Sequence, residues 1–400
     1  MYKQIYLKRG KEDSLLRFHP WIFSGAISRI DEGLEEGETV RVMTHDGRFI
    51  AVGHFQIGSI AVRILSFRDV EIDDTFWESR LRTAFQVRRA IGILREWKED
   101  IHFSPNTTYR LVHGEGDNLP GLIIDVYGRT AVMQAHSVGM HVCRFVIAKA
   151  LVKVMGDRLD SIYYKSETTL PFKAELGQEN GFIHGGTDDD IAVENGLKFH
   201  IDWLKGQKTG FFVDQRDNRS LLEEYSNGRS VLNMFCYTGG FSVYAMRGGA
   251  KCVHSVDASE QAIRLTEANI ELNFPNDRRH EAYAEDAFKF LDRAGSNYDL
   301  IVLDPPAFAK HKDALRNALK GYTRLNAIAF RKIKPGGIVF TFSCSQAVNK
   351  DQFRLAVFTA AAQSGRHVRI LHQLHQPADH PINIYHPEGE YLKGLVLYVE

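Results

Sequence analysis

From residue 229 onward, short apolar segments alternate with segments of helical periodicity, and this alternation limits the possible folds more than any other feature of the sequence. Strands are predicted at 230–235, 252–256, 280–284, 298–303 and 337–343. Helices are predicted between and after them, at 241–247, 260–272, 287–292, 315–333 and 350–362. Short apolar strands joined by helices are typical of a parallel sheet that is covered on both faces. We therefore predict a doubly wound, Rossmann-like sheet, which two more strands at 368–374 and 393–399 would complete.

The N-terminal half follows other patterns, so we predict three domains within an overall α/β fold class. Residues 1–72 contain short alternating segments between glycine turns, a pattern typical of a small β-barrel. Residues 73–190 mix helical and strand patterns, which indicates a middle α+β domain. Residues 191–400 then form the α/β domain that holds the doubly wound sheet.

The middle domain is expected to begin with an amphipathic helix at 75–98, which has a basic face that includes five arginines. Two strands are predicted at 121–127 and 130–134, and a second helix at 139–155. The segment 177–190 is rich in glycine and aspartate and is predicted to be a loop or linker.

The cysteines are scattered, which argues against a metal site and against a disulfide framework. The chain has four of them and no CxxC pair: Cys143, Cys236, Cys252 and Cys344. We therefore predict no metal and expect a cytoplasmic protein. No apolar stretch approaches the roughly 18–20 residues that a membrane span requires, and the N-terminus lacks the apolar region of a signal peptide. The formal net charge is zero, so any surface for nucleic acid has to come from a local basic cluster.

A glycine-containing turn follows the first predicted strand, in the order Phe235-Cys236-Tyr237-Thr238-Gly239-Gly240. In doubly wound folds the cofactor lies beyond the carboxyl ends of the strands, close to such a turn. Asp257 follows the second strand, where it could accept hydrogen bonds from ribose, and Asp286 follows the third, near an adenine amino group. The turn is not the GxGxxG of a nicotinamide site, and Asp257 alone could be an ordinary helix-start acid. Together they predict a nucleotide-like cofactor held by Phe235, Tyr237, Thr238, Gly239, Asp257 and Asp286.

The fourth predicted strand runs into Asp304-Pro305-Pro306, the most specific motif of the chain. Two prolines end the sheet pairing and stiffen the loop, so they hold the Asp304 carboxylate at the strand tip, facing the cofactor. Many methyltransferases that act on a nucleobase use an acid or amide at this place to hold a ring nitrogen or an exocyclic amine. The alternative is a capping acid in a proline-rich loop.

Cys344 follows the fifth strand, between two serines. Neighbouring strand ends lie about 5 Å apart, so Cys344 can share a pocket with Asp304. Carbon 5 of a pyrimidine is too weak a nucleophile to attack a methyl sulfonium, and addition of a thiolate to carbon 6 activates it. The alternative, a small buried hydrophobic residue, is the common fate of a free cysteine and fits Cys143 and Cys252 better.

A basic segment lies between these motifs, with eight lysines and arginines against one acid over 305–335. Part of it could be the ordinary solvated face of a helix. Because it is adjacent to the predicted base pocket, we expect it to contact RNA phosphates, beginning with Lys310 and Lys312.

Six motifs together resemble those of bacterial RNA cytosine-5 methyltransferases of the RlmI type, which modify 23S ribosomal RNA. They are the LKRG that contains Lys8 and Arg9, the HPWIFSG from His19, the KTGFFVDQRDNR from Lys208, Asp304-Pro305-Pro306, Ser343-Cys344-Ser345 and the HPEGEYLKG from His386. The resemblance covers essentially the whole chain.

The resemblance implies a PUA domain, an RNA-binding β-barrel, at the N-terminus, with Lys8 and Arg9 expected at the RNA. It also implies S-adenosylmethionine as the cofactor, near Phe211, Gln215 and Arg216. The implied partner is RNA, 23S ribosomal RNA in particular, with Cys344 as nucleophile and Asp304 beside the cofactor and the base. A homodimer is compatible with it, a membrane partner is not expected, and the HPEGEYLKG motif has no role assigned by it.

One departure from better-studied RNA cytosine methyltransferases is Ala307, where those enzymes carry a second cysteine that helps product release. Related enzymes that methylate a guanine ring nitrogen keep Asp-Pro-Pro and lack the nucleophile. Two alternatives therefore stay open: methylation of an RNA nitrogen with Cys344 incidental, and an RNA-binding assembly factor with an inactive cofactor domain. A small-molecule substrate is disfavoured by the N-terminal module and the basic segment.

Overall fold

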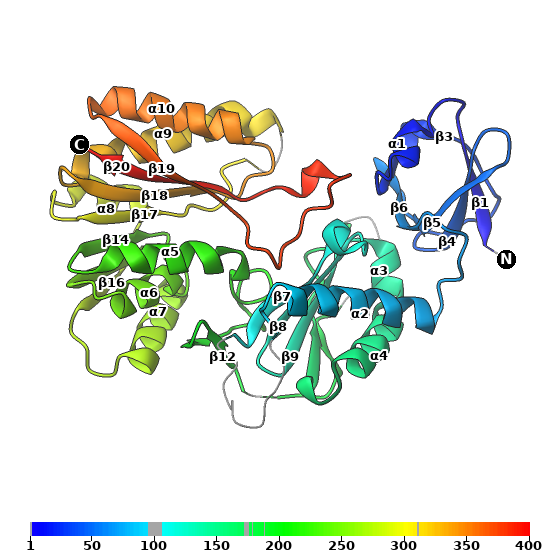
Figure 1. Ribbon diagram of the computed structural model, residues 1–400, viewed down its shortest axis with the longest axis horizontal. Helices are drawn as coiled ribbons and strands as arrows, with labels where there is room; N and C mark the ends of the chain where they lie inside the picture. The colour runs from blue at the N-terminus through cyan, green and yellow to red at the C-terminus, as the bar shows by residue number, and fades with distance from the viewer. Residues whose placement is uncertain (1, 95–105, 172–175, 178, 188, 310–311) are drawn as a thin grey trace. The chain divides into compact units, whose positions relative to one another are not determined.

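The computed structural model describes residues 2–94, 106–171, 176–177, 179–187, 189–309 and 312–400, except the side chain of Lys312 (Figure 1). The chain forms two compact units. The first comprises the chain up to Gly196 together with Ile201–Val213 and Ala378–Gly389. The second comprises Leu197–His200, Asp214–Pro377 and Glu390–Glu400. No helix among the described residues is both long and apolar enough to cross a membrane.

The first unit begins with a six-stranded sheet, which confirms the predicted N-terminal β-domain. Its strands occur in the order β2-β6-β5-β4-β1-β3. They are β1 (Lys3–Leu7), β2 (Trp21–Phe23), β3 (Ile27–Ile30), β4 (Thr39–Met43), β5 (Phe49–Phe55) and β6 (Ile60–Ser66). Alternate residues of β1 and β4, such as Ile5, Leu7, Val40 and Val42, fill one core, as period-two alternation requires.

The same unit holds a five-stranded sheet of order β11-β10-β9-β8-β7, which is the predicted α+β part. Its strands are β7 (Thr108–His113), β8 (Leu122–Tyr127), β9 (Thr130–Ala135), β10 (Ser161–Tyr164) and β11 (Gly181–His184). The helices are α2 (Asp74–Ala90), α3 (Val138–Val142) and α4 (Arg144–Met155). The prediction of a loop over 177–190 is wrong at β11, which is a strand that pairs with β10.

Helix α2 begins where Asp73 accepts a hydrogen bond from the Phe76 amide, a standard N-cap. Not all of its arginines face solvent, because Arg88 is fully buried. Its guanidinium donates to Asp117 Oδ2 at 2.9 Å and to the Asp379 carbonyl at 2.6 Å. Residues 95–98 of the predicted helix lie outside the described residues.

The second unit is the predicted doubly wound domain, with seven strands in the order β16-β15-β14-β17-β18-β20-β19. The strands are β14 (Ser230–Met234), β15 (Cys252–Asp257), β16 (His280–Ala284), β17 (Leu300–Leu303), β18 (Gly337–Ser343), β19 (Val368–His375) and β20 (Lys393–Val399). The first five run parallel. β20 differs, because it runs antiparallel between β18 and β19.

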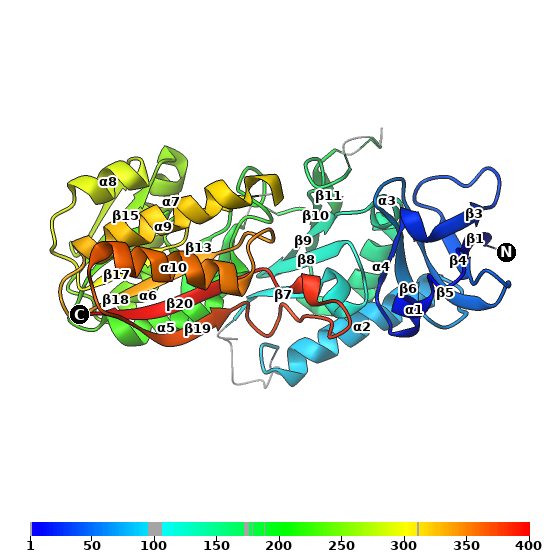
Figure 2. The ribbon, with the colours of Figure 1, turned by 90° about the horizontal axis from the view of Figure 1, so that it is seen from above.

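Helices cover both faces of this sheet (Figures 1 and 2). One face carries α5 (Arg216–Ser226), α6 (Gly240–Arg247) and α7 (Glu260–Asn273), and the other carries α8 (Ala287–Arg293), α9 (Leu315–Lys332) and α10 (Lys350–Ser364). The strand order reverses between β14 and β17, and ligands of such sheets bind at that reversal, beyond the carboxyl strand ends. A ligand is therefore expected to contact the loops after β14, β15, β16, β17 and β18.

The domain boundaries remain predictions. The one at 72/73 lies between β6 and α2, and the one at 190/191 lies just before β12 (Ile191–Glu194). The two compact units divide the chain differently, since Ile201–Val213 and Ala378–Gly389 group with the first unit.

Candidate active site

The loop after β14 has an unusual backbone. Phe235, Tyr237 and Gly239 all lie in the left-handed region, with φ of 60°, 47° and 77°. This conformation is energetically unfavourable for residues other than glycine, and residues that adopt it are concentrated at functional sites. At Gly239 only glycine fits, because an added Cβ would lie 2.6 Å from Thr266 Cγ2.

Helix α7 and strand β15 hold this loop in place. Thr266 Oγ1 donates to the Tyr237 carbonyl at 2.9 Å, and Asn269 donates to the Thr238 carbonyl at 2.8 Å. Asp257 Oδ2 accepts from the Tyr237 amide at 3.0 Å, while Oδ1 accepts from the Ser259 amide at 2.9 Å. Each carboxylate oxygen can accept a second bond, so the predicted ribose contact fits Asp257. The glycine-containing loop after β14 and the Asp257 carboxylate therefore fit a nucleoside cofactor.

Asp286 has a structural task that the sequence analysis did not assign. It caps α8, with Oδ1 accepting from the Lys289 amide at 3.0 Å. Because Asp257 pairs with Ala284 across β15 and β16, Asp286 follows at the same edge of the sheet. It is exposed, and its adenine contact stays a prediction.

Asp304 lies at the end of β17 and is held by residues at the start of α5. Gln215 Nε2 donates to Asp304 Oδ2 at 2.9 Å, and Asn218 fixes the Gln215 amide by donating to its oxygen at 2.6 Å. Burial raises the pKa of Asp304 to about 7, with a further increase from Asp214 and an opposing effect of Gln215 and Arg219. At neutral pH this carboxyl can therefore give a proton or take one.

The remaining residues predicted at the cofactor are divided between the two units. Arg216 is buried at the first turn of α5 in the second unit. Phe211 is buried in the first unit, where its carbonyl accepts from the Tyr127 hydroxyl at 3.3 Å. Asp214, which the sequence analysis missed, accepts from the Tyr391 hydroxyl at 2.7 Å.

Cys344 follows β18, the strand that pairs directly with β17, with Leu303 opposite Thr341. The structure therefore brings Cys344 and Asp304 to neighbouring strand ends. Cys344 is partly exposed. Its loop is tied to the loop after Asp304, because Ser345 Oγ donates to the Ala309 carbonyl at 2.5 Å.

Two residues beside Cys344 were missed by the sequence analysis. Tyr322 of α9 accepts from Ser343 Oγ at 2.9 Å, and burial raises its pKa to about 12, with Cys344 and Asp304 adding to the effect. Lys393, the first residue of β20, is buried and donates to the Ser345 carbonyl at 2.5 Å. A lysine at the start of a strand is usually exposed, so the sequence carried no signal for it.

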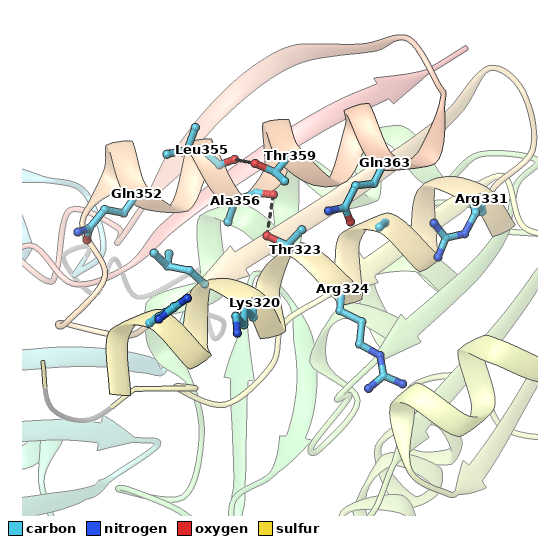
Figure 3. A pocket seen from close by; sticks show the side chains of 12 residues that line it. Lys320, Thr323, Arg324, Arg331, Gln352, Leu355, Ala356, Thr359 and Gln363 are labelled. Carbon is cyan, nitrogen blue, oxygen red and sulfur yellow. Dashed lines mark hydrogen bonds between the residues drawn. The ribbon is translucent and has the colours of Figure 1, made fainter. Parts of the chain in front are cut away.

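The basic segment forms one wall of a groove between α9 and α10, with a volume of about 490 Å³ (Figure 3). Its exposed cations are Arg316, Lys320, Arg324 and Arg331. Thr323 and Ala356 join the two helices by a hydrogen bond of 3.2 Å.

The four residues predicted at the RNA can be placed only in part. Lys310 lies outside the described residues, and of Lys312 only the backbone is described, in a short 3-10 turn. Lys8 and Arg9 follow β1 and are exposed, and Lys8 Nζ donates to the Gly25 carbonyl at 2.9 Å.

The two histidine-proline motifs meet in the first unit. The rings of Trp21 and His386 lie 4.3 Å apart between centroids, and the Trp21 indole donates to Glu115 at 2.8 Å. The first half of the HPEGEYLKG motif thus packs on the N-terminal domain, whereas its second half supplies Tyr391 and Lys393 to the second unit.

Comparison with known proteins identifies both domain types. The family model for S-adenosylmethionine-dependent methyltransferases matches residues 185–389, and the model for a PUA-like domain matches residues 5–67. Ribosomal RNA large subunit methyltransferase I of Aeromonas hydrophila is 41% identical over 99% of both chains, and that of Aeromonas salmonicida is 40% identical over 98% of both. A solved protein structure from Streptococcus mutans has the same fold, with a TM-score of 0.82 at 21% identity over 99% of this chain and 100% of that one.

Proposed function

The chain belongs to the family of S-adenosylmethionine-dependent methyltransferases, and we propose that it methylates carbon 5 of a cytosine in 23S ribosomal RNA. The RNA substrate is supported by the names of the full-length relatives and by the PUA-like domain. The carbon 5 position is supported by one observation above all, the placement of Cys344 and Asp304 at neighbouring strand ends.

The geometry suits covalent activation of the base. S-adenosylmethionine supplies an electrophilic methyl group on its sulfonium. The Cys344 thiolate adds to carbon 6 of the cytosine, while the neutral Asp304 carboxyl gives its proton to ring nitrogen 3. This makes carbon 5 electron-rich enough to take the methyl group. When water then takes the carbon 5 proton, the carbon–sulfur bond breaks and ring nitrogen 3 returns its proton to Asp304.

RNA is expected to reach this pocket as a flipped-out base, because carbons 5 and 6 are inaccessible in a stacked helix. We propose that phosphates on either side of that base contact the cations of the α9–α10 groove. Lys8 and Arg9, both exposed, are proposed to contact RNA at the PUA-like domain. We further propose that the protein acts in the cytoplasm; a homodimer stays a prediction.

The test uses purified protein, methyl-labelled S-adenosylmethionine and ribosomal RNA that lacks its own modification, followed by nucleoside analysis. Label in 5-methylcytosine that is lost in Cys344→Ala and kept in the control Cys252→Ala would support the proposal. Label in a nitrogen-methylated base that survives Cys344→Ala would overturn it in favour of direct transfer. Cofactor binding without label, on naked RNA and on ribosomal particles alike, would favour a binding role.

A further inference from the structure

Lys393 lies against the loop that carries Cys344, because β20 pairs antiparallel with β18 and places Lys393 opposite Ser343. Only 6% of its surface is exposed. Its amino group donates to the Ser345 carbonyl at 2.5 Å and to the Tyr391 carbonyl at 2.7 Å. One of these two carbonyls belongs to the residue directly after Cys344, so the amino group is held at the main chain of the loop that carries the thiol.

A buried ammonium normally requires a carboxylate beside it. Among the described residues, none accepts a hydrogen bond from Lys393: both acceptors are main-chain carbonyls, and the nearby Glu390 is ion-paired with Lys350. Two positions of the amino group are thus occupied, which leaves its third proton, or the lone pair of the neutral amine, for another group. Burial lowers the pKa of Lys393 to about 8, and an ionised Cys344 opposes that decrease.

We propose that Lys393 is a positioning residue that exchanges a proton with Cys344. It takes the thiol proton when the sulfur attacks the base and returns it when the sulfur leaves. The inference rests on the proposed function, in which Cys344 is the nucleophile.

Lys393, Cys344 and water account for the proton transfers of the cysteine cycle. Neutral Lys393 takes the Cys344 proton, which gives an ammonium next to a thiolate, and the thiolate then forms its bond to carbon 6. After methyl transfer, the carbon 5 proton passes to water and the carbon–sulfur bond breaks. The Lys393 ammonium returns its proton to the leaving thiolate, which regenerates the amine and the thiol. Protonation keeps the sulfur from adding again, a task that Ala307 cannot perform.

Other charged and titratable groups surround the pair. Glu390 raises and Lys350 lowers the pKa of Lys393. Tyr322 of α9 is electrostatically coupled to both Cys344 and Asp304, and Asp304 follows β17, the strand that pairs with β18. Because Glu390 and Lys350 neutralise each other in an ion pair, the pH response of Cys344 is expected to follow Lys393 first.

The test measures the reactivity of Cys344 without RNA or cofactor. The rate of Cys344 alkylation by iodoacetamide is followed between pH 6 and 10 by mass spectrometry of its peptide, for wild type, Lys393→Met and Lys393→Arg. A cation next to a thiol lowers its pKa by about one unit or more. We therefore expect the alkylation inflection of Lys393→Met to move up by about one pH unit, with roughly tenfold slower reaction near neutrality.

Lys393→Arg separates charge from proton exchange. A guanidinium keeps the positive charge but does not release its proton, so alkylation should stay fast while methyl transfer slows. Cys252 in the same samples serves as an internal reference. Lys165→Met serves as a matched control, because Lys165 is a partly buried lysine that also donates to a main-chain carbonyl. Circular dichroism identifies a variant that does not fold, in which case Lys393→Gln replaces Lys393→Met.

The outcomes distinguish the two levels of the proposal. If Lys393→Met has the same alkylation profile as wild type, and wild type forms 5-methylcytosine, the role of Lys393 is overturned and the proposed function stays intact. Arg and Met variants that methylate as fast as wild type overturn it as well. A wild-type enzyme that forms no 5-methylcytosine overturns the proposed function, whatever the alkylation profile. A shifted profile together with slow methylation by both variants supports the inference.

Discussion

Gln215 donates a hydrogen bond of 2.9 Å to Asp304 Oδ2, although the two residues are 89 positions apart in the sequence. Asn218 holds the amide so that its nitrogen faces the carboxyl. A donor stabilises the ionised form of an acid, so Gln215 limits the increase in pKa that burial and Asp214 cause. Burial and this hydrogen bond therefore act on the pKa of Asp304 in opposite directions.

The first prediction concerns the alkaline side of the pH profile. If neutral Asp304 is the required form, its ionisation should contribute to the decrease of kcat/KM on the alkaline side of the profile. Gln215→Leu removes the donor, so the pKa of Asp304 should rise and the decrease should move up by about one unit. Steady-state methylation between pH 5.5 and 9 measures this. The exposed Gln261→Leu should leave the inflection unchanged, and a downward shift in Gln215→Leu would contradict the assignment.

The second prediction separates backbone strain from the cofactor site. Gly239→Ala forces a side chain into a left-handed position and against Thr266, whereas Gly365→Ala has a similar φ of 71° with nothing within 4 Å. Gly365→Ala should cost about 1–2 kcal/mol of stability, and Gly239→Ala should cost more because of the close contact with Thr266. Only Gly239→Ala should also weaken S-adenosylhomocysteine binding, by about tenfold or more, in isothermal titration calorimetry. Equal loss of affinity in both variants would argue against a cofactor role for this loop.

The sequence predicted the parallel core of the second unit well, because each buried strand is a continuous apolar run and each strand end carries a recognisable residue. Asp257, Asp304 and Cys344 were all placed at the carboxyl edge for this reason. The direction of β20 could not be predicted in the same way, since either direction gives the same apolar pattern. β11 was missed because alternate residues of this short strand are exposed and glycines flank it.

The finer parts of the site depend on contacts between distant segments. Gln215 was expected near the cofactor, but nothing in its neighbourhood indicates that Asp304 is its partner. Lys393 is buried only because β20 lies between β18 and β19. The packing of Trp21 on His386 joins residues from nearly opposite ends of the chain, and no local pattern predicts it.

The third prediction concerns RNA binding by the α9–α10 groove. Arg316→Gln and Lys320→Gln each remove an exposed cation from its wall. Each should weaken RNA binding and reduce the slope of log affinity against log salt by about one. Filter binding at several salt concentrations measures both. Arg264→Gln, an exposed arginine of α7 with an ion pair to Glu260, is the control. Unchanged slopes in the groove variants would exclude phosphate contacts there.

The fourth prediction concerns the acid stability of the first unit. His54 of β5 is buried, stacked on Trp77 and packed against Gly139. Burial lowers its pKa to about 4, and Arg63 adds to the decrease. The unfolded chain has a histidine pKa of about 6.5, so between these values it binds more protons than the folded protein. The stability contributed by neutral His54 is therefore complete above pH 6.5 and is lost as the pH falls, by about 3 kcal/mol at pH 4.

Chemical denaturation between pH 4 and 8 tests this, with the first unit followed by a fluorescent label or by hydrogen exchange. His54→Phe keeps a ring of similar shape and cannot be protonated, so its free energy of unfolding should depend less steeply on pH than that of wild type. The exposed His45→Phe should keep the wild-type slope. Because His141, another buried histidine of this unit, also has a pKa lowered to about 4, some acid sensitivity should remain in His54→Phe. A slope equal to that of wild type would mean that His54 is already protonated in the folded protein, or that this side chain stays hydrated.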